Sequence, residues 1–97
     1  DALKSYKEAL EIYRKLAQTN SQAYLPYVAI TLINLSVFYQ ECQPDKDVSV
    51  QYAMEALKIL TPFLERVPYT KQYTLAALQV LLTWGVDIEK ILAGEDK

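Results

Sequence analysis

The sequence predicts an all-α protein of four helices, and three observations support this fold class. Apolar residues make up 52% of the 97-residue chain, which has only 2 glycines and 4 prolines. Apolar side chains recur at spacings of three and four residues, the period of a helix with a buried face. Residues that favour turns and caps separate these stretches at three places. We therefore expect an antiparallel stack of helices and no strand.

The first two helices are expected over about residues 2–18 and 22–42, separated by the turn-forming residues Thr19–Ser21. Pro26 is expected in the first turn of the second helix, where the N–H that proline lacks would have no helical partner. This second helix is apolar on two sides, with one stripe of Val28, Leu32, Leu35 and Tyr39 and another of Ile30, Ile33 and Val37. Because both sides must be covered, an interior position is predicted.

The segment Gln43–Asp47 is the clearest turn of the chain, and either Asp45 or Asp47 is expected to cap the third helix, over about residues 46–66. Pro62 should kink or end the regular helix near Leu60, because proline removes a backbone hydrogen bond. The fourth helix is expected over about residues 69–93, with Gly94 as its stop.

Two stretches share one arrangement of small and large residues. Ala2 and Ala9 bracket Tyr6 in the first helix, and a version of this pattern recurs in the third at Ser49, Tyr52, Ala53, Ala56, Leu57 and Leu60. Between them, packing positions of the partner helix are filled by Leu32, Leu35, Ser36 and Tyr39. The pattern resembles the tetratricopeptide repeat family, and residues 24–29 resemble its kinesin-light-chain-like branch, which has longer repeats.

The resemblance implies an antiparallel helix-pair solenoid. Residues 1–22 would be the second half of a repeat, residues 23–62 a full repeat, and residues 63–97 a half repeat or cap. Because Asp1 already lies in a helical pattern, we expect a fragment of a longer array. A closed four-helix bundle is the competing architecture, since it would bury the same stripes around one axis. Asn34 discriminates between the two, because a solenoid leaves it on an open concave face.

Catalysis is not expected. The chain has no histidine and one cysteine, which excludes zinc-finger spacing and a Cys/His nucleophile pair, and its two glycines form no phosphate-binding loop. We predict no catalytic residue, no metal and no cofactor. A net charge of −2 without a basic patch argues against nucleic acid. Apolar runs fall short of the ~18 residues of a membrane span. The single Cys42 is expected in the core and favours a cytoplasmic location.

A protein-interaction role is the first functional hypothesis. In the tetratricopeptide repeat family, the asparagine position before the packing leucine faces the concave groove and can bind a peptide backbone. Here that position is Asn34, whose amide could instead bond a neighbouring helix or water. The predicted partner-binding residues are Asn34, Ile30, Ile33, Val37, Gln40 and Glu41. Their apolar centre favours an apolar or amphipathic protein segment as partner. The alternative is that Ile30, Ile33 and Val37 pack against the fourth helix.

An architectural or oligomerisation element is the second hypothesis, because the fourth helix is apolar nearly all round. The isolated chain is expected to pair with a second copy through one of its two ends. One end would present Leu3, Leu10 and Tyr13, and the other Leu75, Leu82, Trp84 and Val86. Trp84 is expected in the core, at a cap or on such a surface.

Overall fold

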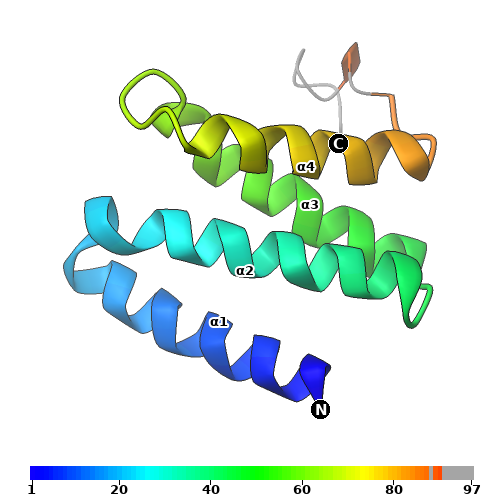
Figure 1. Cartoon of the computed structure of the whole chain (residues 1–97), viewed down its shortest axis with the longest axis horizontal. Helices are drawn as coiled ribbons and strands as arrows, with labels where there is room; N and C mark the ends of the chain where they lie inside the picture. The colour runs from blue at the N-terminus through cyan, green and yellow to red at the C-terminus, as the bar shows by residue number, and fades with distance from the viewer. Residues whose placement is uncertain (88, 91–97) are drawn as a thin grey trace.

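The computed structural model describes residues 1–87, 89 and 90. Its elements are α1 (Ala2–Thr19), α2 (Ser21–Glu41), α3 (Lys46–Leu60), the short 3-10 helix η1 (Thr61–Phe63) and α4 (Thr70–Thr83). The described residues contain no strand. Consecutive α-helices run in opposite directions along the stack (Figure 1). The predicted all-α fold with four packed helices is confirmed.

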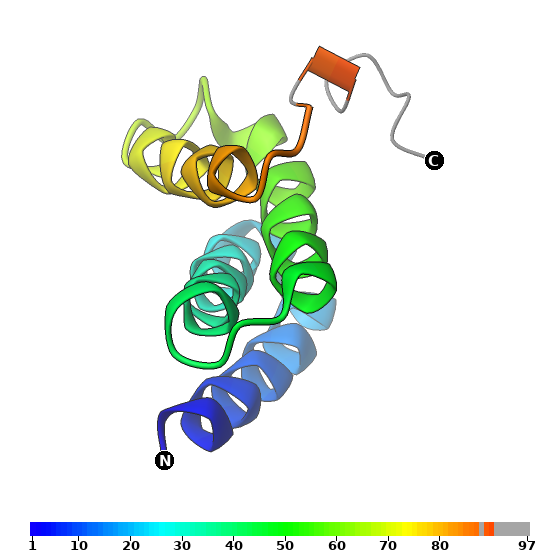
Figure 2. The ribbon, with the colours of Figure 1, turned by 90° about the vertical axis from the view of Figure 1, so that its right-hand side faces the viewer.

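Helix α2 lies at the centre of the stack. It packs against α1, α3 and α4, and α3 also packs against α4. Helices α1 and α4 lie at opposite edges and share no substantial contact (Figure 1). Figure 2 shows α2 and α4 on one side of the stack and α3 on the other. The first and last helices therefore do not close over α2.

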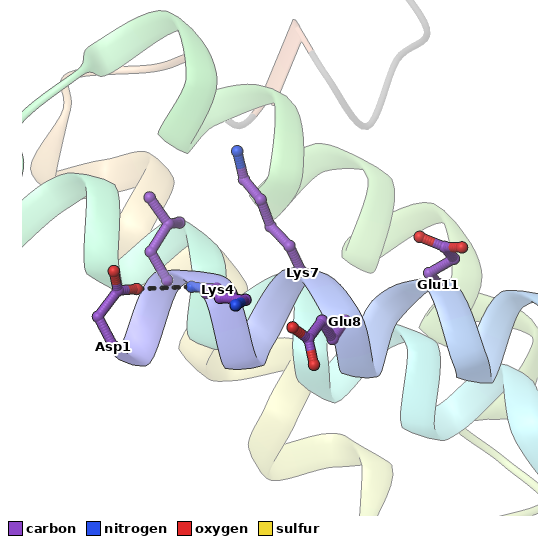
Figure 3. Close-up of a pocket in the computed structure, with 6 residues that line it drawn as sticks. Asp1, Lys4, Lys7, Glu8 and Glu11 are labelled. Atoms are coloured by element: carbon purple, nitrogen blue, oxygen red, sulfur yellow. Dashed lines mark hydrogen bonds between the residues drawn. The ribbon is translucent and has the colours of Figure 1, made fainter.

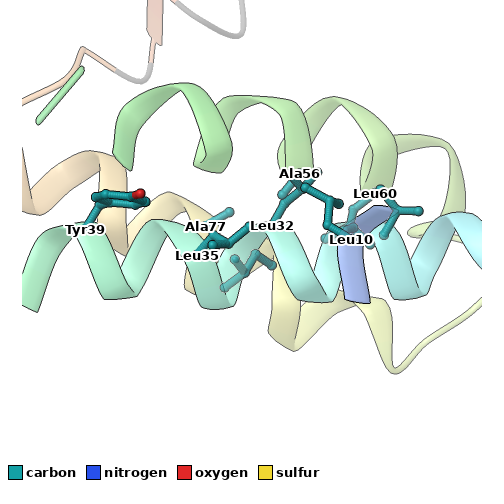
Figure 4. Packing of buried hydrophobic residues seen from close by; sticks show 10 residues of the cluster. Leu10, Leu32, Leu35, Tyr39, Ala56, Leu60 and Ala77 are labelled. Carbon is teal, nitrogen blue, oxygen red and sulfur yellow. The ribbon is translucent and has the colours of Figure 1, made fainter. Parts of the chain in front are cut away.

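Side chains from all four α-helices meet in a core around α2. Leu32 and Leu35 of α2 are fully buried, and the same cluster contains Leu10 of α1, Leu60 of α3 and Ala77 of α4 (Figure 4). A smaller cluster joins α3 and α4 and consists of Ala53, Leu57, Val80 and Leu81. Complete burial of one leucine side chain stabilises a fold by about 1.5–3 kcal/mol. The core around α2 is therefore the main source of cohesion.

One residue, Asn20, both ends α1 and begins α2. Its backbone N–H donates to the carbonyl of Leu16 (3.0 Å), and its side-chain oxygen accepts from the N–H of Ala23 (3.2 Å). Because this cap starts α2 at Ser21, Pro26 lies inside the helix, and the prediction that it lies in the first turn is wrong. Pro26 is buried in the fold. Its ring cannot donate the helical hydrogen bond that another residue would make at this position.

The limits of α3 follow the prediction. The side chain of Asp45 accepts from the N–H of Val48 (3.2 Å) and caps the helix. The regular helix ends at Leu60, and Pro62 lies in the 3-10 helix that follows. A proline at this point cannot continue the α-helical hydrogen-bond ladder, which explains the change of helix type.

Helix α4 ends at Thr83, well before the predicted end near residue 93. Gly85 has a φ of +79°, the left-handed region that glycine adopts without strain. Its N–H donates to the carbonyl of Leu82 (2.9 Å), and the N–H of Val86 donates to that of Leu81 (2.9 Å). This pair of bonds is the Schellman arrangement that terminates helices. The predicted stop, Gly94, lies outside the described residues, as do Ile88, Ile91 and Leu92.

A chain of hydrogen bonds joins the end of α4 to α3 and α2. The indole N–H of Trp84 donates to Ser49 Oγ (2.9 Å), Ser49 Oγ donates to the carbonyl of Ser36 (2.6 Å), and Ser36 Oγ donates to that of Ile33 (2.7 Å). Both serines are fully buried. Trp84 therefore fastens the last turn of α4 onto α3, and its half-buried ring packs on the α3–α4 cluster.

The prediction that Cys42 lies in the core is wrong. Cys42 is exposed, because α2 ends at Glu41 and the chain turns away from the core at that point. Helix α2 is long and apolar enough to cross a membrane by length and composition alone, with a mean hydropathy of 1.2 over an 18-residue window. In the fold, 44% of that window is buried. The contacts with α1, α3 and α4 are typical of a central helix.

Ser49→Ala is expected to lower the free energy of unfolding by about 1–3 kcal/mol, because it removes the buried hydrogen bond to the Ser36 carbonyl and leaves the Trp84 indole without its acceptor. Urea unfolding followed by far-UV circular dichroism measures this loss. Ser5→Ala, at an exposed position of α1, is the control and should leave the stability unchanged. Equal stability of the two variants would contradict the stabilising role of the hydrogen bonds that join Trp84, Ser49 and Ser36.

Gly85→Ala should lower stability by about 1 kcal/mol, because alanine is strained at positive φ. No atom lies within 4 Å of the position that its Cβ would take, so backbone strain is the only cost. Gly85→Asn should cost less, because asparagine tolerates the left-handed region better. Thermal melts of the three proteins give the order, and an alanine variant as stable as the parent would contradict this helix end.

Candidate functional site

The candidate site begins with a line of side chains along α2 that the other helices cover only in part. We call it the α2 strip, and it consists of Ile30, Asn34, Val37 and Glu41. Asn34 and Glu41 are exposed, and Ile30 and Val37 are half-buried. The spacing of three and four residues places all four on one side of the helix. The exposure of Asn34 is the outcome expected of an open array and not of a closed bundle.

The other sides of α2 are occupied by its three neighbours. Towards α1, the ring of Tyr27 stacks on that of Tyr13, with 5.4 Å between the centroids. Towards α3, Tyr39 stacks on Tyr52 at 6.1 Å. Towards α4, Gln40 Nε2 donates to the carbonyl of Val80 (3.3 Å). The α2 strip therefore lies between the flank that meets α1 and the flank that meets α4.

Two of the six residues predicted for partner binding belong to the contact with α4. Ile33 is only 5% exposed and is part of the core, and Gln40 is engaged with Val80. The two positions are seven residues apart and so lie on the same side of the helix. The alternative reading, in which the aliphatic residues pack against the fourth helix, is supported at Ile33, which shares a cluster with Ala77, and at Val37, which packs on the cluster that contains Val80 and Leu81. Asn34, Ile30, Val37 and Glu41 remain as the open part of the site.

Asn34 lies beside a hollow between the start of α1 and the end of α2. The hollow has a volume of about 230 Å³ and is lined by Ala2, Tyr6, Asn34, Val37, Phe38 and Cys42. Its wall is mostly apolar, and the amide of Asn34 supplies both a donor and an acceptor. The hollow is large enough for one side chain of a bound segment.

Helix α4 contributes a second line of side chains, which sequence reasoning missed. We call it the α4 strip: Gln72, Ala76, Gln79 and Thr83. Ala76 packs against the core around α2, and the other three are exposed. The i, i+4, i+7 and i+11 spacing was visible in the sequence, but only the bond between Gln40 and Val80 shows that this side of α4 adjoins α2.

The side of the stack formed by α2 and α4 is almost free of charge. Glu41 is the only charged residue of α2, and Lys71 is the only one of α4. Helix α1 carries six, namely Lys4, Lys7, Glu8, Glu11, Arg14 and Lys15. Helix α3 carries four, namely Lys46, Asp47, Glu55 and Lys58. Most charged residues of the helices therefore lie on α1 and α3, and amide and hydroxyl groups provide the polarity of the α4 strip.

The charged groups of α1 and α3 are explained by helix stability and pairing. Arg14 and Glu55 form a two-point ion pair between the helices, with N–O distances of 2.7 and 3.1 Å. The hydrogen bond to Glu55 raises the pKa of the Arg14 guanidinium above its ordinary value. A shallow hollow at the start of α1 is lined by exposed charged side chains that point in different directions (Figure 3). There Asp1 accepts from the N–H of Lys4 (2.8 Å) and caps the helix.

Among residues 1–87, 89 and 90, no group of three side chains of the metal-ligating types is close enough to hold an ion. The arrangement of the α2 and α4 strips offers neutral donors, neutral acceptors and small apolar contacts. Such a surface can hold a polypeptide by its backbone and side chains.

Comparison with known proteins assigns no family to this chain. No family model, no curated protein and no solved structure matches the chain significantly. The resemblance to tetratricopeptide repeats therefore stays a prediction from the sequence pattern.

Proposed function

We propose that this chain is a non-catalytic protein-interaction module, built as a tetratricopeptide-like helix-pair solenoid, that binds a partner segment across α2 and α4. The observation that carries the proposal is the unequal distribution of charge. Helices α2 and α4 have one charged residue each, whereas α1 and α3 together have ten. A surface with few charges loses little hydration free energy when a partner covers it.

The openness of the stack supports the same face. Because α1 and α4 share no substantial contact, the α2 strip between them is covered only in part, with Asn34 and Glu41 exposed and Ile30 and Val37 half-buried. A closed bundle would bury this strip, and its half-exposed Ile30 and Val37 would then be ordinary core residues. In the open stack they form an apolar line that a partner can cover.

The chemistry of the face suits an extended or helical segment of a protein. The amides of Asn34, Gln72 and Gln79 can each donate to a backbone carbonyl and accept from a backbone N–H. Ile30, Val37 and Ala76 supply apolar contact between them. The side chains of both strips can bind and orient a partner segment and exclude water from it. None of these side chains is a nucleophile paired with a base.

The double substitution Asn34→Ala with Gln79→Ala is expected to weaken partner binding at least tenfold, because it removes amide contacts from both strips. The immobilised chain is used to retain binding proteins from an extract, which mass spectrometry then identifies and quantifies. Gln51→Ala on α3, also exposed, is the matched control. Ile33→Asp is unsuitable, because Ile33 is buried and its loss would unfold the core.

Thermal melts must show that the double variant is as stable as the control variant. If both variants retain the same proteins in the same amounts, the α2–α4 face, which consists of the α2 strip and the α4 strip, is not the binding site.

An architectural or oligomerisation role is the second candidate, and a separate observation favours it. On α4, Leu75 and Leu82 are 56% and 59% exposed, on a side that no described helix covers. On α1, Ile12 is 57% exposed. The predicted surface of Leu3, Leu10 and Tyr13 is wrong, however, because these residues pack into the core. The exposed apolar residues of α1 are instead Ile12 and Leu16, on the opposite side of that helix.

If the exposed leucines of α4 drive self-association, Leu75→Gln with Leu82→Gln should shift the chain towards its monomer mass of 11.1 kDa. Light scattering over a range of concentrations gives the mass of both proteins. Ile12→Gln tests the other end of the stack in the same way. A parent chain that stays monomeric at every concentration would contradict this second role.

A further inference from the structure

The exposed polar groups of the α2–α4 face discriminate between classes of partner segment. Resting on the proposed function, we infer that the segment is apolar and free of acidic residues, and carries one lysine or arginine that lies beside Glu41. This inference goes beyond the location of the site, because it assigns the charge of the partner and its position along the face.

Acidic partners are disfavoured by the absence of basic groups on the face. Neither the α2 strip nor the α4 strip contains lysine, arginine or histidine. A carboxylate that lost its water against this surface would find only neutral amide and hydroxyl donors. Burial of an ion without an opposite charge is costly, whether the carboxylate belongs to a side chain or to a chain terminus. The segment is therefore internal to its protein or has its terminus elsewhere.

Neither α2 nor α4 places a basic residue at the end of the face where Glu41 lies. Helices α2 and α4 run in the same direction, so both C-terminal ends lie at the same end of the face (Figure 1). The C-terminal end of a helix carries a partial negative charge from its aligned peptide dipoles and attracts cations. Neither helix has a basic residue in its last turn. The exposed carboxylate of Glu41 adds a full negative charge to the same end of α2.

The neighbouring turn does not reverse this sign. Between Glu41 and the first turn of α3, the chain carries Asp45 and Asp47 against Lys46, a net charge of −1. Asp45 is also held as the cap of α3 through its bond to Val48. A basic side chain of the partner therefore meets an acidic surround at Glu41, and two hydrophobic positions of the α2 strip, Val37 and Ile30, lie next along the same line.

The probe is a display library of short random segments held between fixed flanks, so that neither end of the random part is free. Selected sequences should contain a lysine or arginine at one constant position and should lack aspartate and glutamate. Synthetic peptides with blocked termini then give dissociation constants by fluorescence anisotropy. Replacement of the peptide's basic residue by glutamate should weaken binding to the parent chain about two- to fivefold, the range of an exposed ion pair.

Charge reversal on the protein identifies the group that the peptide meets. Glu41→Lys should reverse the preference and favour the glutamate peptide, and Glu41→Gln should abolish it. Glu8→Lys, which makes the same change of charge at an exposed position of α1, should behave as the parent chain does. Melting curves confirm that each variant is folded.

The outcomes separate this inference from the proposed function. Acidic selected peptides would show that the assigned charge is wrong. The same conclusion follows if Glu41→Lys still prefers the basic peptide while Asn34→Ala with Gln79→Ala weakens peptide binding, because the face then binds peptides without a role for Glu41. If no peptide binds, or if the double variant binds as well as the parent chain, the proposed function itself fails.

Discussion

The burial of α2 is the constraint on which the rest of the structure depends. Its 21 residues include one charged side chain, so the helix is stable in water only where other helices cover it. Three neighbours do so, and Leu32 and Leu35 become inaccessible to solvent. Because α1 and α4 lie at opposite edges, one line of α2 stays open. The candidate site is this remaining part of a helix that is otherwise core.

Hydrogen bonds determine how the helices around α2 are aligned. The small residues Ser36 and Ser49 let α2 and α3 approach closely, and the bond from Ser49 to the Ser36 carbonyl fixes one helix along the other. Trp84 then joins the end of α4 to the same serine. The bond from Gln40 to Val80 places α4 beside α2. Together these contacts hold the α4 strip next to the α2 strip, so the groups that fix the fold also set the geometry of the site.

Local signals in the sequence predicted the helices well, and long-range packing explains what they missed. The cap at Asp45 and the break at Pro62 act through neighbouring backbone groups, so both could be read from the sequence. The end of α4 was missed because apolar spacing continues through Gly85, whose positive φ the pattern does not reveal. Exposure of Asn34 was foreseen, but the engagement of Gln40 was not, because the direction from which α4 approaches depends on pairwise packing.

The central claim is that α1 and α4 stay apart and leave the α2 strip open. Spin labels at Ile12→Cys and Leu82→Cys, in a chain that also carries Cys42→Ser, report the separation of these exposed positions by pulsed electron resonance. Packed helix axes lie 8–10 Å apart, so two helices separated by a third place their labels about 20 Å apart or more. We expect a single distance of that size. A principal distance of about 10 Å, the spacing of helices in direct contact, would show a closed bundle and contradict the account.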